Sequence, residues 1–154
     1  MKLTKNQLFH KVEDIANRVK EDLRKKGYVV PVKERNGTIN LDGIRVRKVK
    51  ETFYSVYDRH DRAVVENLNS LQTAIVLANR LALNKSVDDL LVEADRQFGF
   101  QSFKLEVAET RIKKVPLYSE KWFYYDMRRK TAQENTKKHL DVIQKSYKKL
   151  ANLR

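Results

Sequence analysis

Three side chains that could bind a metal ion or transfer a proton stand close together in the stretch FYSVYDRHDRAVVENL. Asp58, His60 and Asp61 supply two carboxylates and an imidazole within four positions, and such groups serve as metal ligands and as general acids or bases. A functioning site would also need groups that converge on them from elsewhere in the chain. The other histidines, His10 and His139, lie in distant segments with helical patterns and without an acidic cluster of ligand spacing.

The same stretch has the pattern of a turn between two strands. Residues 58–62 separate two β-rich runs, and aspartate is favoured at the first position of a turn. Aspartate and histidine also tolerate backbone angles that most residues avoid. An exposed turn lacks the dry pocket that would shift the pKa values of its side chains. We therefore predict a turn here, with no catalytic residue and no metal ligand.

Motifs typical of enzymes are absent from the rest of the sequence. The chain has no cysteine, only four glycines and none of the patterns GxxxxGK[ST], GxGxxG or GxSxG. These patterns bind phosphates, bind dinucleotides or present a serine nucleophile. We therefore predict that the protein is not an enzyme and has no cofactor and no small-molecule substrate.

The composition predicts one ordinary globular domain with a cationic surface. The chain has 154 residues, of which 41% are hydrophobic and 34% charged, and its net charge is +13. The excess of basic over acidic side chains is +6 in residues 1–68, +1 in residues 69–118 and +6 in residues 119–154. Such a surface attracts nucleic acid, an anionic membrane or acidic protein faces. The N-terminal sequence MKLTKNQLFHKVED becomes charged too soon for a signal peptide, and no run approaches the ~18 apolar residues of a membrane span. We expect neither secretion by a signal peptide nor a membrane partner.

The hydrophobic pattern predicts an α+β fold that begins with a helix. Thr4 and Gln7 have the spacing of a capping box, and the helix should end near Gly27. An apolar stripe repeats at steps of three and four residues, and we expect the following sheet to cover it. Its members are Leu8, Val12, Ile15, Val19 and Leu23.

A small antiparallel meander should follow this helix. Runs rich in β-branched and aromatic residues alternate with the turn pairs Asn36-Gly37 and Asp42-Gly43, which favour tight hairpins. Arg45 and Arg47 alternate with apolar residues, so both should lie on the exposed face of the sheet. The predicted strands cover residues 28–32, 38–41, 44–49, 53–57 and 63–68.

Two helices should follow the sheet, the first capped by Asn69 or Ser70. Leu77, Leu81 and Leu91 are expected in the core. Ser86 begins the second helix, in which Gly99 could cause a bend or an interruption. The line predicted to be buried in that helix is Leu90, Ala94, Phe98, Leu105, Ala108 and Ile112.

A last helix should run from Ser119 towards Leu153, and its middle is almost entirely polar. We therefore divide the chain into an α+β domain, residues 1–118, and a long basic helical arm, residues 119–154, packed on that domain or projecting from it. Trp122 and Tyr125 could anchor a partner, although aromatic residues at a helix start more often pack inside a helical hairpin. The basic residues of the arm that could bind a partner or a polyanion are Arg128, Arg129, Lys130, Lys137, Lys138, Lys145, Lys148 and Lys149.

The stretch FYSVYDRHDRAVVENLNSLQTAIVLANRLALNKSVDDLLVEADRQFGF resembles small proteins of unassigned role encoded by marine tailed phages, in particular those that infect cyanobacteria. The similarity covers roughly residues 28–112 and rests on a strand, turn, strand, helix pattern with the pieces VYD and ANRLAL. The resemblance implies a phage protein, a component of the virion that is found there or in the host cytoplasm. Other virion subunits would then be its partners.

Three functional hypotheses follow from these patterns. The first is a structural or assembly protein that binds acidic surfaces of neighbouring subunits. The second is an accessory protein that binds nucleic acid, although the chain has no helix-turn-helix, RNP or KH signature. The third is an enzyme, which would require a cluster of reactive side chains that the sequence does not show.

Overall fold

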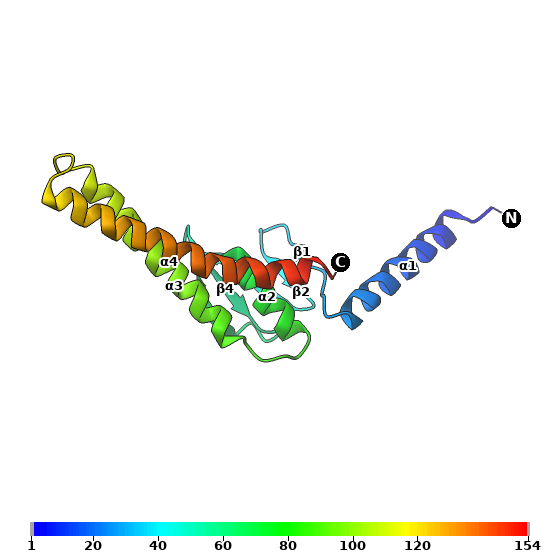
Figure 1. The fold of residues 1–154 in the computed structure, drawn as a ribbon. Helices are drawn as coiled ribbons and strands as arrows, with labels where there is room; N and C mark the ends of the chain where they lie inside the picture. The colour runs from blue at the N-terminus through cyan, green and yellow to red at the C-terminus, as the bar shows by residue number, and fades with distance from the viewer. Residues whose placement is uncertain (1, 154) are drawn as a thin grey trace.

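The computed structural model describes residues 2–153 and shows the α+β fold that the sequence predicts (Figure 1). A helix comes first, a five-stranded antiparallel sheet second, and three helices last. The helices are α1 (Lys5–Lys25), α2 (Leu71–Ala82), α3 (Asp89–Ile112) and α4 (Glu120–Ala151). The strands are β1 (Val32–Lys33), β2 (Ile39–Leu41), β3 (Ile44–Val49), β4 (Phe53–Tyr57) and β5 (Ala63–Leu68).

The sheet is a meander in which each strand pairs with the next one in the chain, in the order β1-β2-β3-β4-β5. Asp42 and Gly43, with φ of 50° and 93°, connect β2 to β3 through the left-handed backbone that a tight hairpin needs. Val46 of β3 pairs with Val56 of β4, and both side chains are buried. Helix α2 contacts this inner part of the sheet and has its most buried side chains there.

The core is built by the sheet, α2 and parts of α3 and α4. Leu77 of α2 and Leu91 of α3 are fully enclosed, which confirms these two predicted core positions, whereas Leu81 is only half-buried and packs against the core cluster. Ile143 and Leu150 of α4 belong to the same cluster. The arm predicted for residues 119–154 therefore packs on the domain along its C-terminal part and helps to form the domain's core.

Helices α3 and α4 form an antiparallel hairpin that extends beyond the sheet (Figure 1). The prediction that Leu90 faces the core is wrong, because this side chain is 82% exposed. Asp88 caps the helix through a bond from the backbone N–H of Leu91, and this start turns Leu91 inwards and Leu90 outwards. The helix continues through Gly99 without interruption. Ala94, Ala108 and Ile112 are buried as predicted, whereas Phe98 and Leu105 are half-buried.

Helix α1 begins with the predicted capping box at Thr4 and then projects away from the body, on the side opposite the α3–α4 loop (Figure 1). None of its residues is buried, so the prediction that the sheet covers its apolar stripe is wrong. The inner face of the sheet is already occupied by α2. The end of α1 is held by Arg24, which pairs with Asp42 and donates to the carbonyl of Ala82 at 3.1 Å.

Candidate functional site

The loop that joins β4 to β5 is a turn, as predicted. Its two aspartates are engaged by the backbone of the turn and by Arg47 of β3. Asp58 Oδ1 accepts the backbone N–H groups of His60 and Arg62, both at 2.9 Å. The bond from the Arg62 N–H is the main cause of a lowered pKa at Asp58, and the His60 N–H adds to it. Asp61 has a φ of 60° and forms an ion pair with Arg47 at 2.8 Å. Within residues 2–153, no group of three or more His, Cys, Asp and Glu side chains could hold a metal ion.

The two predicted arginines of the sheet lie on the face that α2 does not cover. Arg47 Nη2 contacts Asp61, and its guanidinium carbon lies 4.7 Å from the centre of the Tyr57 ring. Arg45 Nε lies 3.8 Å from a carboxylate oxygen of Glu34. Each arginine therefore has an acidic neighbour, which reduces the positive potential of this surface.

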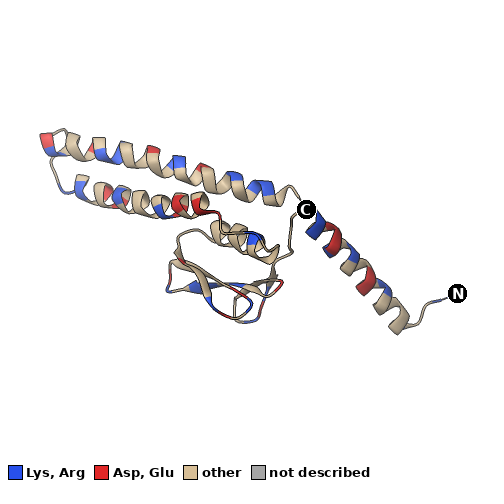
Figure 2. Cartoon of the chain, turned by 90° about the horizontal axis from the view of Figure 1, so that it is seen from below, with Lys and Arg blue, Asp and Glu red and all other residues tan. Residues whose placement is uncertain are grey.

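The cations of α4 fall into two groups. Near the start of its polar middle, Asp126 pairs with Arg129 and, at 3.2 Å, with Lys130. Burial alone would raise the pKa of Asp126, but the two cations together outweigh it and lower that pKa. Further along, Glu134 and Asp141 are interspersed among the lysines in the sequence. Figure 2 shows acidic segments between the basic ones along this helix. The exposed cations of α4 among the predicted residues are Arg128, Lys130, Lys137, Lys138, Lys145, Lys148 and Lys149.

The aromatic cluster at the start of α4 is only partly inside the hairpin. Trp122 and Tyr125, the two predicted anchors, are half-buried. Three residues beside them, which were not predicted as anchors, are more accessible: Phe123, Tyr124 and Met127 are 55%, 51% and 70% exposed. Their exposure depends on which side of α4 meets α3, and the crowded run WFYYDM does not show this.

A groove of about 400 Å³ lies between α3 and α4 in the outer half of the hairpin. Its base includes Ala108 and Ala132, which are almost fully buried where the two helices pack. Because alanine is small, α3 and α4 can approach each other closely at these two positions. Larger side chains surround the alanines and form the walls of the groove. The exposed side chains that line this tip groove are Phe103, Lys104, Arg111, Tyr124, Met127, Arg128 and Thr131.

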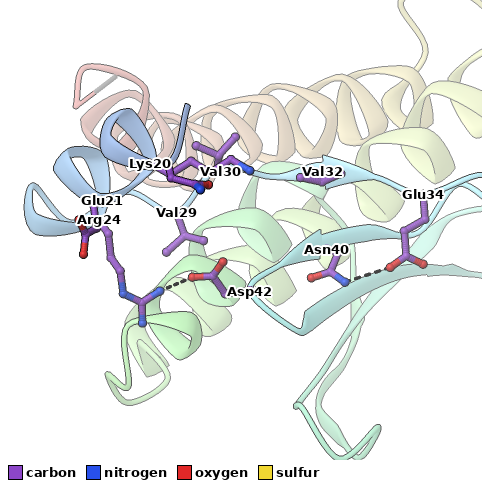
Figure 3. A pocket seen from close by; sticks show the side chains of 10 residues that line it. Lys20, Glu21, Arg24, Val29, Val30, Val32, Glu34, Asn40 and Asp42 are labelled. Carbon is purple, nitrogen blue, oxygen red and sulfur yellow. Dashed lines mark hydrogen bonds and ion pairs between the residues drawn. The ribbon is translucent and has the colours of Figure 1, made fainter. Parts of the chain in front are cut away.

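A second hollow, of about 420 Å³, lies between the end of α1 and the edge of the sheet (Figure 3). Arg24 pairs there with Asp42, and Asn40 Nδ2 donates to Glu34 at 3.0 Å. These four polar groups pair with one another and hold the base of α1 against the edge of the sheet.

The apolar stripe of α1 forms the other large exposed surface. Leu8, Val12, Ile15 and Val19 are between 52% and 57% exposed, and Phe9 beside them is 66% exposed. In the part of the chain that the structure describes, no helix has the length and apolar character needed to cross a membrane. Comparison of the chain with protein-family models, with characterised proteins and with solved structures gave no match.

Proposed function

We propose that this chain is a structural or assembly protein without catalytic activity, which binds neighbouring protein subunits. The observation that carries this proposal is α1, a helix of 21 residues with an apolar stripe and no buried residue. A helix alone in water is only marginally stable, and most helices are stabilised by packing an apolar face. Burying a Leu, Val or Ile side chain contributes roughly 1.5–3 kcal/mol. A partner subunit that covers the stripe would supply this stabilisation.

The resemblance of residues 28–112 to small phage proteins extends the proposal to a virion component. The α1 stripe lies on α1 and the tip groove on the α3–α4 hairpin. These two elements extend to opposite ends of the molecule (Figure 1), an arrangement that suits a subunit that connects others. The excess of positive charge favours acidic surfaces on those subunits.

Photo-crosslinking in the native cell tests this proposal. A crosslinking amino acid is placed at Val12 on the stripe or, as the matched control, at His10 on the opposite side of the same helix. We expect position 12 to join one protein in a fixed ratio and position 10 to join none. Absence of a protein product from position 12, or equal products from both positions, would contradict the proposal.

Binding of nucleic acid is the second candidate, and the exposed lysines of α4 favour it. A charge-reversed variant at Lys137, Lys138, Lys145 and Lys149 is the appropriate test, since it leaves the Asp126 ion pairs intact. If these residues contact phosphates of duplex DNA, the slope of log K against log salt should fall by about 0.9 for each lost contact. An unchanged slope would show that this row of lysines is only a solvated face.

A further inference from the structure

The tip groove combines an apolar surface with a rim of positive charge. Phe103 and Met127 are 62% and 70% exposed at its sides, and no aspartate or glutamate lines it. Large apolar side chains that stay accessible beside a hollow are typical of binding surfaces. The groove could hold one or two apolar side chains of a partner.

Three cations border this apolar surface, and aromatic rings position two of them. Lys104 Nζ lies 4.5 Å from the centre of the Phe100 ring, and the guanidinium of Arg128 lies 4.7 Å from that of Tyr124. Arg111 is the third. Within residues 2–153, none of the three cations forms an ion pair. A ligand that brings carboxylates to this rim would therefore meet cations that have no competing acidic partner.

We propose that the tip groove binds an amphipathic segment of a different protein, in which apolar anchor side chains are flanked by Asp or Glu. This proposal rests on the proposed function, because it gives the chemistry of one subunit that the chain would bind. The anchors would fill the groove, and the carboxylates would pair with Lys104, Arg111 and Arg128.

A second copy of this chain fits the groove less well. Each copy has a net charge of +13, so two copies repel one another. Its own exposed stripe, on α1, has Lys11 and Arg18 along one border, four residues before and three residues after Ile15. Docking that stripe in the groove would place cations beside cations.

A random peptide library selected against the full chain tests the proposal. We expect the selected peptides to share apolar residues flanked by Asp or Glu, and to bind more weakly as salt rises. Two exposed positions are then changed singly, Met127→Ser to remove an apolar wall and Arg128→Glu to reverse a rim charge. Each change should raise the Kd by about tenfold or more, which corresponds to roughly 1.4 kcal/mol.

Two matched changes outside the groove serve as controls, Leu117→Ser and Lys85→Glu. Both residues are exposed and neither lines the groove, so the Kd should change less than about twofold. Selected peptides that lack acidic residues, or that bind both groove variants as tightly as the parent, would overturn the proposal.

Two further measurements distinguish this proposal from nucleic-acid binding at the groove and from the proposed function itself. Titration with a single-stranded oligonucleotide identifies a nucleic-acid surface, and binding that is lost in Met127→Ser would overturn the peptide proposal. The α1 crosslinking result does not depend on the groove. A crosslink from position 12, together with failure of the groove variants to weaken the selected peptides, would retain the proposed function and reject the acidic segment.

Discussion

Asp95 of α3 caps a helix to which it does not belong. This carboxylate is completely enclosed and accepts the backbone N–H groups of Asn69 at 2.7 Å and Ser70 at 2.9 Å, at the start of α2. The sequence predicted a cap from Asn69 or Ser70, yet the Ser70 side chain makes no capping bond. Local spacing cannot indicate a cap that comes from 25 residues away, because only the packing of α3 beside α2 brings Asp95 to this place.

Gly99 leaves space for the side chain of Asn69, next to the Asp95 cap. A Cβ atom at this position would lie 2.3 Å from Asn69 Nδ2, which donates to the carbonyl of Asp95 at 3.1 Å. Glycine inside a helix costs about 1 kcal/mol relative to alanine. Its presence in α3 is explained by the close approach of the Asn69 side chain.

A double-mutant cycle measures the energetic coupling between Gly99 and Asn69. Gly99→Ala should destabilise the parent, because Asn69 must move and lose its bond to Asp95. In an Asn69→Ala background the same change should stabilise the protein by about 1 kcal/mol, since the space is then free. Urea unfolding of the four proteins gives the coupling energy. Additive effects of the two changes would show that the contact is unimportant.

Asp58 gives the protein a pH dependence in the acidic range. Its pKa is lower in the folded state than in the unfolded state, so the unfolded chain binds more protons. The stability that Asp58 contributes is therefore present above the unfolded-state pKa, and it is lost as the pH falls through the folded-state value. Asp58→Asn removes this proton linkage.

Urea midpoints of the parent and of Asp58→Asn, measured from neutral pH to strong acid, check this expectation. The stability difference between the two proteins should shrink as the pH falls. A difference that stays constant over the range would show that the turn does not hold Asp58 in its charged form.

At the scale of elements, the last four predicted strands match β2 to β5 because turn pairs and alternation specify hairpins locally. The first prediction, a strand over residues 28–32, is wrong, since β1 covers only Val32–Lys33 and the preceding residues form no strand. The second part of α4 was harder to place. Its apolar residues return at Leu140, Ile143, Tyr147 and Leu150, but the pattern does not show what they contact. The structure places Ile143 in the same core cluster as Leu77, so a chain that ends at Pro116 should expose that core and fail to fold.

Ile143→Ala tests whether α4 is integral to the domain. We expect a loss of about 2 to 5 kcal/mol, because this side chain is fully buried and the change leaves a cavity. Val142→Ala is the matched control on the neighbouring exposed position and should stay within about 0.5 kcal/mol of the parent. Thermal or urea unfolding gives both values. Equal stability of the two variants would mean that α4 only lies on the surface.

At the scale of the whole molecule, the sequence correctly predicted the stripe of α1 but not its exposure. An amphipathic pattern indicates that one face of a helix packs against another apolar surface. It does not indicate whether that surface belongs to the same chain or to a partner. The tip groove was missed for a related reason. It exists only through the register between α3 and α4, which depends on the contacts of both helices together.

Hydrogen exchange distinguishes the two ends of the molecule. Amides of α1 should exchange rapidly in the isolated protein, because no buried contact holds this helix closed, whereas those of α2 should exchange slowly. Addition of the protein that is identified by crosslinking from position 12 should slow amide exchange in α1. Strong protection of α1 in the isolated, monomeric protein would contradict its projecting position.

The burial of Leu150 also bears on when this protein can fold during synthesis. Every strand pairs with its neighbour in the chain, so the meander can form as it leaves the ribosome. Leu150 nevertheless belongs to the same core as Tyr28 and Val29, more than a hundred residues earlier. Part of the apolar surface of the sheet and α2 therefore stays exposed until residues 143–150 have been synthesised. During this interval the nascent chain is most prone to aggregate or to need a chaperone.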